Sequence, residues 1–483
     1  MVLFWPLCIP LLGAALLLGC RARRVASGLA LVFCAAEAIA IGNTVWQVHK
    51  CGSIEGRYLR ADGLTSFFLV NIAFIMVLSL VYATGYLRHM GEGRFASPRW
   101  FYALVNLFLF TMVGVCLSAN LGLLWIMMEA TTLASALLVG FYNTKGAVEA
   151  GWKYLMVCTV GIAFALFGTI VFYLSAVNAG LSHASALDWT TLIAAASRKQ
   201  FDPHLLQLAF VFILVGYGTK VGLVPMHSWL PDAHAEAPTP ISAMLSAILL
   251  NCAMYALMRY EILVSRAMGT QFAHTLLLFF GTLSIVVAGL LILVQRNLKR
   301  MLAYSSVEHM GIIAIGMGLG GPLGLLGALL HTFNHSVAKA LLFFGAGSVR
   351  QKFGTLRMDR VRGMARSAPW TAGFLVVGGL AIVGMPPFGL FVSEFAILSE
   401  AFSHSHYLVG GLFLGVLSVV FGGFVYHLIH MTCGQPREVP PNPHLTRAEF
   451  ASMLVAGICL LYFGVHIPAA FSVLLHDAIT VLQ

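Results

Sequence analysis

Charged residues are scarce in this sequence of 483 residues, in which Asp, Glu, Lys and Arg make up 10% and hydrophobic residues 59%. The mean hydropathy is +0.89. Because a soluble protein of this length needs a charged surface, the composition excludes a soluble globular fold and predicts an integral membrane protein with many spans. The net charge of +10 comes from short loops between apolar runs. Without a basic patch on a soluble domain, nucleic-acid binding is not expected.

Paired cysteines are missing as well. The nine cysteines never form a C-x-x-C motif, and most of them lie within apolar runs. The sequence therefore encodes neither an iron–sulfur cluster nor a zinc site, and any coupled redox chemistry belongs to another subunit. The apolar N-terminus lacks the charged region that begins a signal peptide, so we expect 2–20 to be a retained first span.

Fourteen apolar runs are long enough to cross a bilayer at about 20 residues per span. The sequence thus predicts an all-α, polytopic membrane protein of about fourteen transmembrane helices. The predicted spans are 2–20, 25–47, 63–87, 100–118, 119–142, 153–177, 204–225, 239–263, 272–294, 301–318, 322–348, 369–401, 407–431 and 448–475.

Basic residues are distributed unevenly between the two sets of loops. Loops after odd-numbered spans are rich in them, with Arg296, Lys299 and Arg300 after the ninth span and six more at 350–366 after the eleventh. Loops after even-numbered spans hold far fewer. By the positive-inside rule, the arginine-rich loops are cytoplasmic and both termini are extracytoplasmic, in a bacterial or archaeal cytoplasmic (inner) membrane.

Glycine and proline interrupt two of the predicted spans. The seventh contains Gly218, Gly222 and Pro225, and the twelfth, 369–401, is too long for one straight helix and contains GMPPFG at 384–389. Broken helices five spans apart are typical of paired inverted repeats. We expect four parts: helices 1–3 in 1–99, a first repeat of helices 4–8 in 100–263, a second repeat of helices 9–13 in 264–431, and a loop with helix 14 in 432–483.

Lys220 follows the apolar run 205–215 and therefore lies where hydrocarbon is expected. A charge at that depth costs about 2.5–3.5 kcal/mol on insertion scales and usually faces a bundle interior or aqueous cavity with a partner. Glu129, near the middle of the fifth span, is the simplest partner, because opposite charges favour the ionised form of both groups. The alternatives are a lysine that reaches the membrane surface and a protonated Glu129 held by Thr131 or Thr132.

The eleventh span carries His331, His335 and Lys339, spaced four apart so that they share one helical face. This spacing predicts a row of proton carriers. Two such histidines can also bind zinc, but the lysine supplies no ligand at neutral pH and no acidic or Cys partner is near in sequence, so no metal site is expected. A third interpretation is a pair of histidines that form only structural hydrogen bonds.

Glu394 lies eight residues after Pro386, in the second half of the broken twelfth span. A carboxylate beyond a helix break is a candidate gate to the far side of the membrane. Glu308 and Lys153 are further candidates, with a position near the cytoplasmic surface as the alternative for each. Because hydrogen bonds reach about 3 Å and helix axes lie about 8–10 Å apart, protons would pass between these groups only through ordered or transient water.

Four segments carry a family resemblance: HSWLPDAHAEAPTPISAML at 227–245, RMLAYSSVEHMG at 300–311, HTFNHSVAKALLFFGAG at 331–347 and GMPPFGLFVSEF at 384–395. They resemble the antiporter-like subunits shared by respiratory complex I, Mrp-type Na⁺/H⁺ antiporters and membrane-bound group 4 NiFe hydrogenases. The YSSVEHMG form and the loop at 348–364 look most like the F component of hydrogenase-4 and formate hydrogenlyase complexes.

The resemblance implies one half-channel at Glu129 and Lys220, a central axis at His331, His335 and Lys339, and the end of a second half-channel at Glu394. Asn251 departs from the pattern, since complex I relatives usually carry a lysine there. A neutral amide can hold water but supplies no switching charge. A second group of candidate residues comprises Lys153, His227, Asp232, His234, Asn251 and Glu308.

The sequence and the resemblance together predict a subunit that translocates protons, or Na⁺, along buried Glu, Lys and His residues in a redox-driven complex of the hydrogenase-4/formate hydrogenlyase type. The chain would hold no cofactor of its own. Its expected partners are other membrane subunits, together with NiFe-hydrogenase-like and iron–sulfur subunits. Two alternatives stay open, an Mrp-type Na⁺/H⁺ antiporter subunit and an ion-conducting subunit that energises an inorganic-carbon uptake complex with a soluble zinc protein.

Overall fold

The structure is a computed structural model that describes residues 1–89, 97–435 and 445–483, nearly all of them helical. The helices up to the middle of the chain are α1 (Trp5–Gly19), α2 (Arg23–Cys51), α3 (Gly63–Tyr86), α4 (Pro98–Leu117), α5 (Leu121–Val139), α6 (Lys145–Asn178), α7 (Trp189–Ser197), α8 (Pro203–Val221), α9 (Leu230–Glu236), α10 (Thr239–Met244) and α11 (Leu250–Met268). Those that follow are α12 (Gln271–Leu293), α13 (Leu298–Leu319), α14 (Gly321–Phe353), α15 (Met364–Ser367), α16 (Pro369–Ile382), α17 (Gly389–Ser403), α18 (Tyr407–Thr432), α19 (Arg447–Val465) and α20 (Ala469–Leu482).

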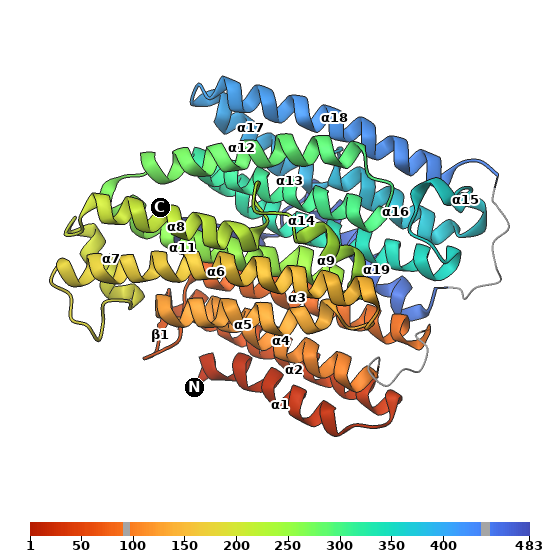
Figure 1. Cartoon of the computed structure of the whole chain (residues 1–483), viewed down its shortest axis with the longest axis horizontal. Helices are drawn as coiled ribbons and strands as arrows, with labels where there is room; N and C mark the ends of the chain where they lie inside the picture. Colours follow the sequence, from red (N-terminus) through yellow and green to blue (C-terminus); the bar gives the residue numbers. More distant parts are fainter. Residues whose placement is uncertain (90–96, 436–444) are drawn as a thin grey trace.

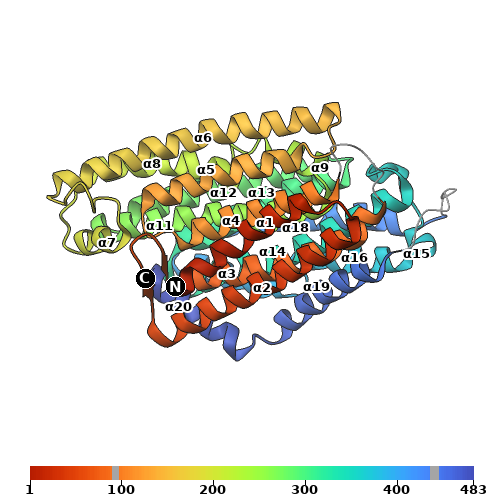
Figure 2. The same ribbon diagram turned by 90° about the horizontal axis from the view of Figure 1, so that it is seen from below.

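The long helices run roughly side by side in one bundle (Figure 1). Both views place α7 at one end of this bundle and α15 at the other (Figures 1 and 2), and both termini lie toward the α7 end. A short hairpin of β1 (Ile54–Glu55) and β2 (Arg60–Ala61) joins α2 to α3. The termini thus share one side of the bundle, opposite the arginine-rich loops around α15.

Twelve helices of the described residues are long and apolar enough to cross a membrane. One of them, Thr239–Met268, combines α10 and α11 through a π-helical segment, η3 (Leu245–Leu249). The two further predicted spans correspond to α14, a 33-residue helix with His and Lys in its middle, and to the pair α16 and α17. The predicted all-α, multi-pass membrane fold is confirmed.

Helices end at the glycine- and proline-containing segments of the seventh and twelfth predicted spans. Asp202 caps the start of α8 by accepting a hydrogen bond from the backbone N–H of His204 at 2.8 Å, and α8 ends at Gly222, whose φ of +84° suits glycine. In the twelfth span, α16 ends at Ile382 and α17 begins at Gly389. The division into inverted repeats with the boundaries given above stays a prediction, and residues 436–444 of its last part lie outside the described residues.

The last predicted span, 448–475, is not one helix. It divides into α19 and α20, and Pro468 occupies the position before the first residue of α20. Proline lacks a backbone N–H and has a fixed φ, so it ends a preceding helix but suits the start of a new one.

Helix α14 lies at the centre of the bundle, where it packs against α3, α10, α13, α16, α17, α19 and α20. Residues 327–349 are all buried, so this helix is enclosed on every side. Its polar face is therefore directed into the interior of the protein and away from lipid.

Candidate ion-translocation site

Lys220 lies in the last turn of α8, and its side chain is fully buried. Its Nζ donates hydrogen bonds to Thr132 Oγ1 and to the Tyr154 hydroxyl, each at 2.7 Å. The Tyr154 hydroxyl also pairs with Ser135 Oγ at 2.6 Å. The lysine therefore does not extend to the membrane surface, and its ammonium group is held by hydroxyls from α5 and α6.

Glu129 does not form the direct ion pair with Lys220 that the sequence suggested. Its Oε1 accepts a hydrogen bond from Thr159 at 2.9 Å and its Oε2 one from Thr132 at 3.4 Å. Among the described residues, no ion pair joins it to Lys220, and Thr132 lies between them. A hydroxyl can both donate and accept, so Thr132 connects the carboxylate to the ammonium without direct contact.

The predicted row on α14 is fully buried, and a further histidine joins it from α13. His309 Nδ1 lies 2.8 Å from His331 Nε2, and the rings of His309 and His335 have centroids 5.2 Å apart. On its other side, His331 Nδ1 pairs with Ser393 Oγ of α17 at 2.9 Å. Three imidazoles from two helices thus form one cluster, which we call the histidine cluster (His309, His331 and His335).

Lys339 continues this face toward the α15 end of the bundle. Its Nζ donates to the backbone carbonyl of Leu302 in α13 at 2.8 Å. Glu308, also on α13, is buried, and its Oε2 has no hydrogen-bond partner among the described residues. Glu308 is therefore covered by protein and not exposed to solvent.

Glu394 reaches the histidine cluster from the far side of the helix break. One ligand atom each of His309, His331 and Glu394 lie within 4.8 Å of one another. Gly384, in the break, has a φ of +67°, and a Cβ there would overlap the Glu394 carboxylate. The break thus gives the carboxylate the space it occupies, while its Oε1 has no partner in the described part of the chain.

The same three side chains have the composition of a metal site, since zinc takes imidazole and carboxylate ligands. No acidic partner is near in sequence, but the fold brings His309 and Glu394 to His331 from two other helices. The 2.8 Å contact of His309 with His331 needs a proton between two ring nitrogens, so the cluster without a metal holds a shared proton.

Asn251 connects α11 to α14. Its Nδ2 donates to the carbonyl of Ala247 at 2.6 Å and to Ser336 Oγ at 2.8 Å, and Ser336 also donates to Ala247 at 2.7 Å. Ala247 lies in the π-helical segment η3, where the wider turn leaves carbonyl groups open to side chains. Through Ser336, which directly follows His335, Asn251 is bonded to the helix that carries the row, but it brings no charge to the row.

Of the other candidates of the second group, Lys153, Asp232 and His227 lie outside this arrangement, whereas His234 packs against α14. Lys153 Nζ is 2.5 Å from Asp232 Oδ2, Arg300 also contacts Asp232, and the Lys153 side chain is 43% exposed. His227 is half-buried. His234 is fully buried, with its Nδ1 bonded to a backbone carbonyl of its own helix at 2.9 Å and its ring centroid 5.5 Å from that of Phe343 in α14. Lys153 and Asp232 thus belong to a surface ion network, and His234 lies beside the row.

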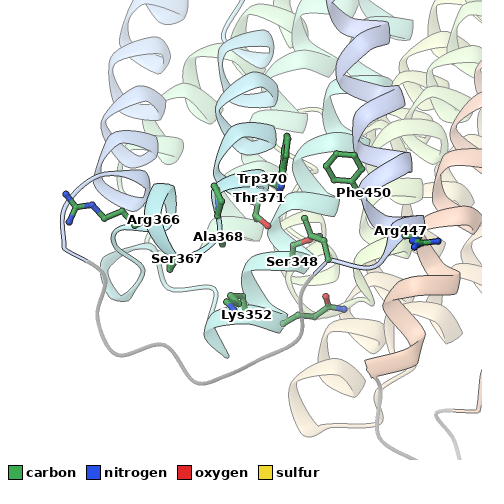
Figure 3. A pocket seen from close by; sticks show the side chains of 12 residues that line it. Ser348, Lys352, Arg366, Ser367, Ala368, Trp370, Thr371, Arg447 and Phe450 are labelled. Carbon is green, nitrogen blue, oxygen red and sulfur yellow. The ribbon is translucent and has the colours of Figure 1, made fainter.

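A cavity of about 580 Å³ lies at the α15 end, where α14, α16 and α19 meet (Figure 3). Its lining combines the basic residues Lys352, Arg366 and Arg447 with the aromatic rings of Trp370 and Phe450. None of the buried candidates named above is part of this lining.

A family model described as NADH:quinone oxidoreductase/Mrp antiporter, TM, matches residues 118–422. The chain belongs to this family. It is 40% identical over 419 residues to a hydrogenase-4 component F homolog of Methylacidiphilum infernorum (isolate V4), covering 86% of each chain. It is 32% identical to NADH-quinone oxidoreductase subunit N of Desulforudis audaxviator (strain MP104C), covering 92% of this chain and 89% of that one.

Among solved structures, a chain of the membrane-bound sulfane sulfur reductase, an archaeal respiratory membrane complex, superimposes with a TM-score of 0.87 at 23% identity, covering 100% of this chain and 97% of that one. The protein is therefore an antiporter-like membrane subunit of the complex I, Mrp and hydrogenase-4 type. The relatives and the structural neighbour are themselves components of multisubunit membrane complexes.

Sequence reasoning missed His309, Tyr154 and Ser393 in this protein. His309 directly follows Glu308 in the motif at 300–311. Successive residues of a helix point about 100° apart, so a prediction that Glu308 faces the interior does not extend to His309. Helix α13 is almost completely buried, and both residues consequently face the interior. The sequence did contain an indication of polar residues buried on this helix, because Leu298–Leu319 is the least apolar of the twelve spans.

Proposed function

We propose that this subunit translocates protons, with Na⁺ as the alternative ion, along its buried polar residues within a redox-driven complex of the hydrogenase-4/formate hydrogenlyase type. The observation that carries the proposal is the histidine cluster with Glu394, in which His309 and His331 are joined by a hydrogen bond and Glu394 of α17 lies within 4.8 Å of both inside the bundle. Such ionisable groups are costly in a membrane interior and mark ion routes. The relation to a hydrogenase-4 component F homolog supports the type of complex.

In this proposal Lys220 is the switching charge of the first half-channel. Thr132 relays its state to Glu129, which is half-buried and bonded to an exposed Thr159. When Lys220 loses its proton, Thr132 and Tyr154 can turn their hydroxyls toward its nitrogen. Thr132 also bonds to Glu129, so this change alters the hydrogen bonds of the carboxylate.

The connection between the two halves runs past Asn251 and Ser336 through water. Both side chains are hydrogen-bonded and uncharged, so protons must be carried there by a hydrated path and not by a titrating side chain. The histidine cluster then receives the proton next to Glu394, and we assign the second half-channel to this carboxylate.

The test is purification of the tagged chain from its native membrane in mild detergent, with mass spectrometry of the proteins that accompany it, followed by proton-translocation assays of the complex. Hydrogenase-like and iron–sulfur subunits, together with redox-linked proton uptake, are the expected result. Small antiporter subunits and sodium-dependent exchange would instead support an Mrp-type function. A soluble zinc protein as the main partner would support an inorganic-carbon uptake complex.

We further propose a cytoplasmic-membrane location with both termini outside the cytoplasm. The end of the bundle near α15 carries the arginine-rich loops, and both termini lie toward the opposite end (Figures 1 and 2), in accord with the positive-inside rule. Cysteine labelling at the two faces tests this topology, and labelling of the α15 end from outside would contradict it.

A further inference from the structure

Two pairs of glutamate and histidine lie apart from the row, at the end of the bundle opposite α15. His404 Nδ1 is 3.0 Å from Glu400 Oε1, and His274 Nε2 is 3.2 Å from Glu261 Oε1. In each pair the carboxylate is buried, with side-chain exposures of 3% for Glu400 and 5% for Glu261. The imidazoles reach solvent, because His404 is 58% exposed and His274 is 20% exposed.

Both pairs meet at the turn between α13 and α14. A Cβ on Gly320 would come within 2.8 Å of the His274 ring, and one on Gly321 would overlap the Glu400 carboxylate. The two glycines have φ values of +63° and +62°. The turn therefore carries no side chain at the place where the two pairs approach it.

Glu400 is fixed at the start of the helix that carries the row. Its Oε2 accepts hydrogen bonds from the backbone N–H groups of Leu323 at 3.0 Å and Gly324 at 3.2 Å, in the first turn of α14. Its Oε1 lies 3.0 Å from His404 Nδ1 but has no hydrogen-bond partner among the described residues, and the same ring nitrogen lies 3.3 Å from the backbone carbonyl of Glu400. One carboxylate thus joins the beginning of α14 to a solvent-exposed imidazole.

Glu400 also lies on the helix that carries Glu394. The two carboxylates are six residues apart on α17, which is about 9 Å along the axis at 1.5 Å per residue. Ile397 lies between them, against Gly327 of α14. The two side chains also point about 120° apart around α17, so a connection between the carboxylates needs a chain of several water molecules.

We propose that Glu400 and His404 form the terminal site at which ions pass between the row and the solution at this face, with Glu261 and His274 as an accessory pair across the turn. The inference rests on the proposed function, with protons as the ion. A proton on the Glu400 carboxyl moves to His404 Nδ1, which leaves a carboxylate and an imidazolium. The imidazolium then gives the proton on Nε2 to water, and exchange with water restores the original tautomer. The reverse order admits a proton.

The first experiment compares Glu400→Gln, Glu400→Asp and His404→Gln in the whole complex, with proton translocation measured in proteoliposomes. Gln can still accept the two backbone hydrogen bonds but cannot take up or release a proton, so a loss of about tenfold or more is expected, with recovery in the Asp variant. His406→Gln is the matched control, because this exposed histidine lies two residues away and should leave the rate unchanged. A wild-type rate in Glu400→Gln overturns the inference.

A Glu394→Gln variant, tested in parallel, distinguishes a failure of the terminal site from a failure of the proposed function. If Glu394→Gln is inactive and Glu400→Gln is fully active, the terminal site is wrong while the proposed function stands. If both variants, and Lys220→Met, keep the wild-type rate, the proposed function itself is wrong and the terminal site with it.

Inhibition by zinc ions provides a second test, which needs no Glu400 variant and so does not depend on whether such a variant folds. An imidazole and a carboxylate 3.0 Å apart can bind Zn²⁺ together with water. Zn²⁺ added at this face is expected to inhibit proton translocation in the wild type and about tenfold less effectively in His404→Gln. Equal inhibition of the two proteins, or inhibition only from the opposite face, contradicts the assignment.

Discussion

Replacing Lys220 by methionine separates the function of its charge from its contribution to stability. The substitution removes two hydrogen bonds of 2.7 Å, each worth about 1.5–3 kcal/mol for a charged donor. It also removes the cost of keeping an ammonium group away from water, which is several kcal/mol per ion. The two effects have opposite signs and similar size, and the methionine chain fills nearly the same volume. We therefore expect the stability of the folded chain to change by no more than about 1–2 kcal/mol.

The groups left behind keep other partners, which is the second reason to expect a folded variant. The Tyr154 hydroxyl still bonds to Ser135, and Thr132 still reaches Glu129. Transport, by contrast, should fall by at least about a hundredfold, because no other side chain of the first half-channel carries a positive charge at that position. A hundredfold loss corresponds to about 2.7 kcal/mol in the barrier.

The assay is proton uptake by inverted membrane vesicles, followed with a pH-sensitive dye, together with the amount of assembled complex on a native gel. Lys145→Met is the matched control, because this lysine is exposed at the start of α6 and its loss should leave both quantities unchanged. Normal assembly with an undiminished transport rate in Lys220→Met would refute the role given to this residue. Loss of assembly would refute the energetic reasoning.

Three further predictions concern other parts of the chain. Asp62→Asn breaks a buried bidentate ion pair with Arg259, whose two hydrogen bonds are 2.6 and 2.8 Å long. We expect this variant to be destabilised by about 3–5 kcal/mol, measured by thermal unfolding. An unchanged melting temperature would contradict this prediction. Burial raises the pKa of Asp62, but the nearby Arg259 outweighs this and lowers the pKa to about 2, so the pair contributes fully above about pH 4 and its contribution is lost as the pH falls through about 2. His309→Leu should reduce proton translocation by about tenfold or more without loss of assembly, since it removes the shared proton of the histidine cluster; a normal rate would show that His331 acts without it. Asn251→Leu should slow transport by about threefold to tenfold by removing the groups that hold water between the two halves, and an unchanged rate in the same assay would place the connection elsewhere.

The sequence pointed to several charged residues at membrane depth, because each of these is visible within a single helix. Lys220 and Glu394 interrupt apolar runs, and His331 and Lys339 share a face by their spacing alone, so no knowledge of packing was needed. The all-α, multi-pass fold followed from the same runs. These predictions depend on local periodicity, which a linear chain shows directly.

The contacts between helices could not be predicted in this way. Whether Thr132 or Glu129 meets Lys220 depends on side-chain positions within a few ångströms, whereas helix axes are about 8–10 Å apart. Lys299 gives a second example, since it was assigned to a cytoplasmic loop but is fully buried, with its Nζ bonded to the carbonyl of Ala237 at 2.7 Å. The number of basic residues in a segment does not distinguish a lysine exposed in a loop from a lysine that is buried by other parts of the protein.

Glu37 is a buried acidic residue that the sequence analysis did not identify. It lies on α2, is 1% exposed, and neither of its carboxylate oxygens has a hydrogen-bond partner among the described residues. The apolar run around it hid a single acidic residue, and no spaced partner drew attention to it.

The polar atoms without protein partners indicate where the row must be hydrated. Within the described residues, both ring nitrogens of His335, both side-chain polar atoms of Asn334, and one oxygen each of Glu308, Asn251 and Glu394 are buried and unpaired. An unpaired buried polar atom costs about 1–3 kcal/mol, so this group of atoms around α14 would strongly destabilise the fold unless water satisfied them. We therefore expect ordered water molecules at these atoms in a high-resolution experimental map of the native complex, forming a chain from Asn251 to Glu394. A dry interior at these positions would remove the path by which protons cross from one half of the subunit to the other.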